Sequence, residues 1–449
     1  MPVDSAAVDE AWLDELSEFI RIPSVSADSE RAADVQQAGE WVCDFVRRAG
    51  GEAELRDWDG HPLALGEIPA SSGSGSAPTV ICYGHFDVQP PAPLDLWESD
   101  PFEATVRDGR VYARGIADDK GQLYMQLKAA EQLAGDGALP VNLRFCCDGE
   151  EETGGHSIVD FLAADERGGD AAVIFDSGMI RRDVSAFNVA TRGMAYFHVT
   201  LRTGARDLHS GLYGGAALNA AHAMIAMLDA LVAHDGTLAE PLRKGIVAPT
   251  NEELAGWELL PAGADELADQ GARPKDPDAA RDFYLRTFAE PALDVNGIQT
   301  GSPVLQKTVL PVEAIANLSS RLAPGQLVEE IAPEVERLLR EAAPDGAELE
   351  VELWSSSPPG LVPPDSRAVQ LGLDAFERAL GRRPALIRSG GTLPIVPALA
   401  DRGIPTVITG FGLPDSQIHS PNERLVAAYV PLGIAAAREL FLAYAALAD

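Results

Sequence analysis

Histidine and carboxylate side chains follow several short apolar runs of this sequence, at the points where buried strands should end. These clusters are His85 with Asp87 after residues 79–84, Asp148 to Glu152 after residues 141–147, Asp176 after residues 171–175, and His419 after residues 405–411. In an open α/β sheet, ligands bind beyond the carboxyl ends of the strands. Taken singly, each cluster has an ordinary structural explanation, such as a solvated run of glutamates. Together, at one edge of a sheet, they favour a metal site.

The residue types in these clusters are those that hold transition metals. Imidazole and carboxylate ligands suit Zn²⁺, and two metals about 3.5–4 Å apart need a bridging oxygen ligand. Asp118 is a further candidate ligand just ahead of a predicted helix, although it or Asp119 could instead be the N-cap of that helix. Residues i and i+2 of a strand face the same side, which places Asp87 to support His85. Adjacent glutamates can divide the roles of ligand and general base.

The elements around these residues indicate an α/β fold. Residues 79–84 and 141–147 are nearly continuous apolar runs, as in strands buried on both faces. Between them, Leu123, Leu127 and Leu133 recur at helical spacing, and the pattern ends at a glycine. Strand, helix, strand in this order predicts a parallel sheet covered by helices.

The pattern changes near residue 190 and changes back after a proline-rich stretch at residues 355–365. Between these points the predicted order is strand, helix, strand, strand, helix, strand, which is the ferredoxin-like signature. The expected elements are strands at 194–203, 304–310, 313–322 and 347–354 and helices at 216–232 and 326–343. We therefore predict an α/β domain made of residues 1–188 and 361–449, with an α+β domain of residues 189–360 inserted into it.

Length, charge and cysteine usage narrow the class of protein. A chain of 449 residues is too long for one ordinary core, and its net charge of −34 argues against a nucleic-acid partner. No apolar run is long enough to predict a membrane span. Trp12, Leu16 and Ile20 predict an amphipathic opening helix rather than a signal peptide. The four cysteines form no CxxC pair, so we expect a cytoplasmic protein whose metal is held by His, Asp and Glu.

Six motifs, in order along the chain, resemble those of metallopeptidase family 20, the dinuclear hydrolases that include carnosinases, dipeptidases and aminoacylases. They are YGHFDVQP (83–90), ARGIADDKGQ (113–122), DGEEETGG (148–155), DLHSGLYGG (207–215), RSGGTLPIVP (388–397) and GFGLPDSQIHSPNER (410–424). One such motif would be weakly diagnostic, but six in register are specific. The resemblance implies a zinc-peptidase-like α/β/α catalytic domain, with the inserted ferredoxin-like domain serving as lid and dimerisation domain.

The resemblance also implies five metal ligands, shared between two divalent ions. They are His85 and Asp176 on one ion, Glu152 and His419 on the other, and Asp118 as a bridge between the two. Asp87 would hold His85, Glu151 would be the general base, and Glu150 would have no role. The family further implies a cis peptide between Asp118 and Asp119. Zinc is the expected metal, with manganese or cobalt as alternatives because such sites accept several divalent ions.

Substrate contacts are implied for residues outside the metal site. His209 would reach the active site of a neighbouring subunit and stabilise the oxyanion, which implies a homodimer. Thr308 and Arg321 match positions that hold the terminal carboxylate of the substrate in carnosinase-like members, and Arg388 and Thr392 would lie near the same end of the substrate. His209 could otherwise be a loop histidine, and Arg321 an ordinary surface residue. The remaining histidines match no ligand position and are His61, His156, His198, His222 and His234.

These features lead us to expect an enzyme that hydrolyses the amide bond of dipeptides or short peptides. Glu151 would take a proton from the attacking water and return it to the leaving amine. One alternative is an N-acyl amino acid deacylase or desuccinylase with the same site, although DLHSGLYGG and the long segment 235–300 favour the peptidase. Another is a non-catalytic binding protein on the same fold, against which the presence of all five ligands and Glu151 argues.

Overall fold

The computed structural model describes residues 10–58, 60–73, 76–232 and 237–448, so that His234 lies outside the described residues. The chain divides into two compact units. Unit 1 holds the residues up to Val189, Val362–Ile387 and the residues from Ala398 onward, and unit 2 holds Ala190–Leu361 and Arg388–Pro397. The expected division differs from this one at residues 388–397, which carry the RSGGTLPIVP motif and belong to unit 2.

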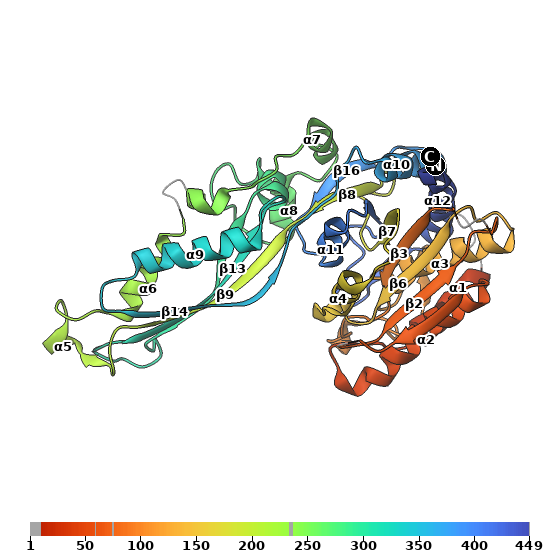
Figure 1. Cartoon of the computed structure of the whole chain (residues 1–449). Helices are drawn as coiled ribbons and strands as arrows, with labels where there is room; N and C mark the ends of the chain where they lie inside the picture. The colour runs from red at the N-terminus through yellow and green to blue at the C-terminus, as the bar shows by residue number, and fades with distance from the viewer. Residues whose placement is uncertain (1–9, 59, 74–75, 233–236, 449) are drawn as a thin grey trace. The chain divides into compact units, whose positions relative to one another are not determined.

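The part of the main sheet that lies in unit 1 has the order β1-β2-β6-β3-β7-β17-β8 (Figure 1). Its strands are β1 (Glu52–Arg56), β2 (Leu63–Ile68), β3 (Thr79–His85), β6 (Asn142–Asp148), β7 (Ala171–Phe175), β8 (Ala186–Thr191) and β17 (Thr406–Thr409). The strands β6, β3, β7 and β17 are parallel to one another, as the apolar runs predicted. β7 is buried along its whole length, as expected of a strand covered on both faces.

Helices cover this sheet in unit 1. They are α1 (Glu10–Ile20), α2 (Ala32–Arg48), α3 (Lys120–Gly135), α4 (Ser157–Ala164), α10 (Arg367–Leu380) and α12 (Tyr429–Ala443). The opening helix is confirmed, because α1 buries Trp12, Leu16 and Ile20. Among the described residues, the stretch Tyr429–Ala448 is long and apolar enough to cross a membrane, by length and composition only. It packs against α3 and α10 and buries Phe441 completely, which is the pattern of a core helix.

A small sheet in unit 1 joins two segments that carry polar residues of the predicted site. Its strands, in the order β18-β5-β4, are β4 (Thr105–Arg107), β5 (Arg110–Tyr112) and β18 (Arg424–Val426). The pairing of Arg424 with Tyr112 continues into a hydrogen bond from Ala113 N to Glu423 O at 3.1 Å. The loop that leads to Asp118 therefore lies against the segment that follows His419.

Unit 2 confirms the ferredoxin-like prediction. Its main elements are β9 (Gly193–Arg202), α6 (Ala220–Asp229), β11 (Ala292–Thr300), β13 (Glu313–Leu322), α9 (Val328–Ala342) and β14 (Glu348–Ser357). The four strands form an antiparallel sheet with the order β11-β13-β9-β14. Apolar residues of β9 and β13 are buried against α6 and α9, and Phe197, Met224, Leu318 and Val335 lie in this core.

The prediction of a strand at residues 304–310 is wrong. The second strand of the sheet is β11 (Ala292–Thr300), and in the expected range only Val309–Leu310 (β12) is a strand, paired with Leu208–His209 (β10). β11 is exposed along most of its length and carries a bulge between Val295 and Gly297. An exposed, bulged strand lacks the alternation of buried and polar residues by which strands are recognised.

Shorter elements complete the described chain. They are α5 (Ser210–Tyr213), α7 (Asn251–Trp257), α8 (Gly263–Asp269), α11 (Ile395–Asp401), a π-helix at Leu285–Ala289, β15 (Gly360–Leu361), β16 (Ala385–Ser389), and 3₁₀ turns at Ser29–Arg31, Leu94–Leu96, Glu151–Thr153, Glu240–Arg243 and Tyr444–Ala448. The four cysteines Cys43, Cys82, Cys146 and Cys147 are all free and buried, as expected of a chain without a disulfide framework.

Candidate metal centre

The carboxyl ends of three neighbouring parallel strands of unit 1 carry polar residues of the site. His85 is the last residue of β3, Asp176 follows β7, and the glutamates of DGEEETGG follow β6. β3 pairs in parallel with both β6 and β7, so these three strands end at the same edge of the sheet. The strand-end clusters recognised in the sequence are therefore neighbours in space, as ligand sites of open α/β sheets require.

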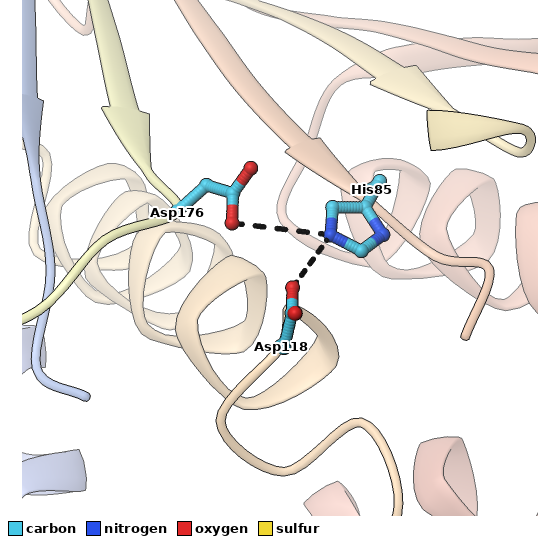
Figure 2. A group of neighbouring side chains, drawn as sticks. All are labelled: His85, Asp118 and Asp176. Atoms are coloured by element: carbon cyan, nitrogen blue, oxygen red, sulfur yellow. Dashed lines mark hydrogen bonds and ion pairs between the residues drawn. The ribbon is translucent and has the colours of Figure 1, made fainter. Parts of the chain in front are cut away.

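Asp118 lies between two groups of ligand-type side chains. Its Oδ1 is 3.0 Å from His85 Nε2, which is in turn 3.9 Å from Asp176 Oδ1 (Figure 2). Its Oδ2 is 2.9 Å from His419 Nε2, which is 3.0 Å from Glu152 Oε2. Each carboxylate oxygen of Asp118 thus faces a different histidine. This is the arrangement that a bridging carboxylate between two cations needs.

The donor set fits two divalent metals. The ligand atoms of His85, Asp118 and Asp176 lie within 4.8 Å of one another, and so do those of Asp118, Glu152 and His419. Imidazole nitrogens and carboxylate oxygens are the ligands of zinc, manganese and related ions. The structure brings all five predicted ligand residues together, and the peptide between Asp118 and Asp119 is cis, as the resemblance implied.

The shifted pKa values of the ligand-type residues also indicate a site that favours positive charge. Burial alone would lower the pKa of His85, but hydrogen bonds with Asp118 and Asp87 outweigh it and raise that pKa well above its usual range. Hydrogen bonds with Asp118 and Glu152 raise the pKa of His419 to about 10. Burial raises the pKa of Asp176 well above its usual range. The carboxylates crowded at this site therefore favour protonated forms of the two histidines and of Asp176. Bound cations would replace those protons.

Asp87 connects the histidine of the site to the turn that carries the glutamates. Its backbone oxygen is 3.1 Å and its Oδ1 3.3 Å from His85 Nδ1. The same carboxylate accepts hydrogen bonds from Glu151 N at 3.2 Å, from Glu152 N at 3.1 Å, and from Ser26 Oγ at 2.6 Å. Asp87 thus orients the imidazole so that Nε2 faces Asp118, and it also fixes the backbone of the two glutamates. Ser26 was not predicted from the sequence.

The three successive glutamates have different surroundings. Glu150 is buried and accepts hydrogen bonds from His61 N and Ser157 N, so it holds the turn together. The Glu152 carboxylate accepts hydrogen bonds from Gln89 and faces His419. No described side chain or backbone N–H donates to the Glu151 carboxylate, and burial raises its pKa to about 7. Glu151 is therefore the glutamate that is free to exchange a proton.

Glu423 is a residue of the site that the sequence did not reveal. It is fully buried, and its carboxylate accepts hydrogen bonds from the Arg114 side chain at 2.7 Å and from three backbone N–H groups of the loop that ends at Asp118. Burial raises its pKa to about 7, although the charge of Arg114 opposes this. Because Glu423 closely follows His419, it couples the segment that carries that histidine to Asp118. Its place in GFGLPDSQIHSPNER was the available signal.

We expect the substitution Glu423→Ala to lower the free energy of unfolding by about 3–5 kcal/mol, because it removes the carboxylate that pairs with the buried charge of Arg114. The loosened loop should also weaken metal binding, measured by competition with a chromogenic chelator. Glu439→Ala is the matched control, since its ion pair with Arg378 is exposed and should contribute at most about 1 kcal/mol. Wild-type metal affinity in Glu423→Ala would contradict this role.

Two residues predicted to contact substrate lie at one end of unit 2. His209 pairs with Val309 across the short ladder of β10 and β12, and Thr308 O accepts a hydrogen bond from Ser210 N at 2.9 Å. His209 Nδ1 accepts a hydrogen bond from Gly211 N at 3.1 Å, so the neutral ring carries its proton on Nε2. Within the described part of the chain no group accepts a hydrogen bond from the exposed Nε2–H, and donors of this kind can stabilise an oxyanion.

Two other predicted substrate residues lie together elsewhere in unit 2. A third is buried, and its hydrogen-bond donors are used within the protein. Arg321 Nη1 donates to Thr392 Oγ1 at 3.1 Å. Arg388, by contrast, is 1% exposed, and its three nitrogens donate to Glu253 and to the carbonyl oxygens of Val247 and Ala248. The structure therefore does not support a substrate contact for Arg388, whose burial could not be seen in the sequence.

Comparisons with known proteins agree with this geometry. Residues 81–443 match the model of peptidase family M20/M25/M40. Over 444 residues, the chain is 30% identical to the Cys-Gly metallodipeptidase dug1 of Schizosaccharomyces pombe, covering 91% of this chain and 90% of that protein. It is 28% identical over 421 residues to the human Beta-Ala-His dipeptidase, covering 91% and 81% of the two chains.

A solved structure shares both the fold and part of the sequence. The M20 family metallo-carboxypeptidase Sso-CP2 from Sulfolobus solfataricus superposes with a TM-score of 0.81 and 25% identity, covering 98% of this chain and 100% of that one. Fold, site and matches define a metal-dependent hydrolase of peptide bonds. The chain belongs to peptidase family M20/M25/M40.

Proposed function

We propose that the protein is a dinuclear metallodipeptidase that acts as a homodimer in the cytoplasm. The two relatives reported above are both named as dipeptidases, and this chain matches them over most of its length. Zinc is the metal we expect, since two histidines and three carboxylates form the donor set. The four free, buried cysteines agree with a reducing compartment.

The observation that carries the proposal is the position of Asp118 between two ligand groups, beside a glutamate whose carboxylate is free. Two bound cations would polarise the scissile carbonyl and activate water at this point. Glu151 takes the proton from that water and then gives it to the amine that leaves. Asp87 serves the same step, because it holds the backbone of Glu151 and the ring of His85 in one arrangement.

The geometry of unit 2 supports the proposed dimer. Asp207, two residues before His209, lies beside Val312 at the start of β13, because Val312 N donates to Asp207 Oδ1 at 3.3 Å. Arg321 lies at the opposite end of β13, about 30 Å away at roughly 3.3 Å per residue. A dipeptide spans only about 7 Å, so it cannot contact His209 and Arg321 of the same chain. We propose that the two residues act on one substrate from different subunits.

The surface around His209 supports a protein partner. Leu212 and Tyr213 are 75% and 48% exposed, and Val304 and Leu305, in the loop before Thr308, are 88% and 60% exposed. Exposed apolar residues that gather in one region mark interaction sites more often than isolated ones do. A second copy of this chain would cover them while it receives His209.

A substrate panel tests the proposed function. We expect the enzyme, loaded with zinc, manganese or cobalt in turn, to hydrolyse Cys-Gly, β-Ala-His and other dipeptides faster than N-acetyl or N-succinyl amino acids. Amine release would be followed by mass spectrometry, so that no substrate needs a chromophore. Faster turnover of the N-acyl amino acids would instead establish a deacylase on the same site.

A further inference from the structure

Two arginines of unit 2 lie together at the end of the central strands. Arg321 belongs to β13 and pairs in register with Met194 of β9, and Arg192 lies two residues before Met194. Both therefore lie at the same end of the sheet. Arg321 was assigned from the resemblance, whereas no role has been assigned to Arg192.

One glycine-containing loop holds both side chains. Thr392 Oγ1 accepts a hydrogen bond from Arg321 Nη1 at 3.1 Å and donates to Arg192 O at 2.8 Å. Arg192 Nε donates to Gly390 O at 3.2 Å, and Arg192 N donates to Gly391 O at 3.0 Å. These contacts fix the position of both guanidinium groups. The Nη nitrogens of Arg192 donate to no described residue.

Neither arginine forms an ion pair with a described residue. Within the part of the chain that the structure describes, no carboxylate lies within 4.0 Å of either guanidinium, whereas the nearby Arg388 has a buried partner in Glu253. Burial and the charge of Arg321 lower the pKa of Arg192 to about 10, and Asp294 offsets this only in part. Two adjacent cations without an anion are unfavourable, and a bound carboxylate would relieve the repulsion.

We infer that Arg192 acts with Arg321 and Thr392 as a recognition residue for the free terminal carboxylate of the substrate. The inference rests on the proposed function and deepens it. Two guanidinium groups on one carboxylate make the negative charge of the substrate a requirement, so peptides whose terminal carboxyl is an amide are poor substrates. The enzyme would thereby act on free dipeptides and leave blocked ones intact.

The experiment compares the best dipeptide of the panel with its C-terminal amide. We expect Arg192→Gln to lower kcat/KM for the free acid by about 10–100-fold, mainly through KM, because a charge-assisted hydrogen bond is lost. Hydrolysis of the amide, measured at higher enzyme concentration, should change less than threefold. Arg192→Lys keeps the charge without the fork and should show a smaller, equally selective loss. Arg281→Gln, an exposed residue of unit 2, is the matched control.

A structural role for Arg192 would give a different result. If Arg192 only supported the loop at Gly390, both variants would lose activity on the acid and the amide by the same factor, and this result, or no loss at all, would overturn the inference. If Arg192→Gln does not fold, the acid-to-amide ratio of Arg192→Lys decides the question. If the wild type hydrolyses no dipeptide, the proposed function fails, and an N-acetyl amino acid and its amide then test Arg192 independently.

Discussion

Replacing Glu151 with glutamine is expected to lower kcat by about 10²–10⁴-fold, the usual contribution of a general base, while the metal content stays that of the wild type. Glutamine keeps the size of the side chain and the backbone N–H bond to Asp87, but it cannot take a proton. Steady-state kinetics and elemental analysis of the same preparation measure both quantities. A variant that loses its metals along with its activity would show Glu151 to be a ligand instead.

Subunit mixing extends this experiment to the dimer. Glu151→Gln and His209→Ala should each be nearly inactive, since removal of one oxyanion donor costs about 10²–10³-fold. If His209 serves the partner's site, a heterodimer of the two variants contains one intact site. Equal amounts that exchange subunits at random should therefore recover about a quarter of wild-type activity. No recovery under conditions where exchange is demonstrated would show that His209 does not act across a dimer.

Removal of the metals should abolish hydrolysis, and so should the loss of Asp118, the proposed bridging ligand. We expect Asp118→Ala to bind neither ion at stoichiometric concentration and to lose at least about 100-fold in activity, because both ligand groups share this carboxylate. Treatment of the wild type with a chelator should have the same effect and should lower its unfolding temperature, since bound ions stabilise the folded state by mass action.

Adding metal back distinguishes inactivity caused by the lost ions from inactivity caused by the lost Asp118 carboxylate. Activity of the stripped wild type should return with added Zn²⁺, Mn²⁺ or Co²⁺, and the ion that restores most activity identifies the preferred metal. Asp118→Ala should not respond to any of them. Glu439→Ala, which removes an acidic residue of unit 1 outside the site, should behave as the wild type throughout. Full activity of Asp118→Ala would exclude it as a bridge.

The parts of the site that could be predicted from the sequence are those whose position follows from the end of a strand. His85 and Asp176 lie where the apolar runs of β3 and β7 end. A parallel sheet brings such strand ends together independently of the conformation of the loops. The pairing of Asp118 with two histidines needed the motif resemblance, because its loop comes from neither strand. The ferredoxin-like order was predicted from strand and helix patterns, although its second strand was placed at residues 304–310 instead of at β11.

Residues that act through tertiary contacts could not be predicted. The role of Glu423 depends on backbone N–H groups of a distant loop, and that of Ser26 depends on a hydrogen bond to Asp87 across the chain. Arg388 looked like a substrate contact because it stands in the same motif as Thr392, yet burial against Glu253 occupies it. β11 was missed because its exposed residues carry no hydrophobic pattern. In each case the deciding property was burial or a partner remote in sequence.

The order of the ligands along the chain has a consequence for the timing of synthesis. His85, Asp118, Glu152 and Asp176 precede unit 2, whereas His419 follows it, as does β17, which lies between β7 and β8 in the sheet. At about 5–20 residues per second, roughly 10–50 s separate Asp176 from His419 on the ribosome. During that interval the nascent chain holds four of the five proposed ligands, with one of the two ligand groups complete and the sheet still open. On the proposed assignment of His419 as a ligand, peptide hydrolysis can begin only after residue 419 has been made.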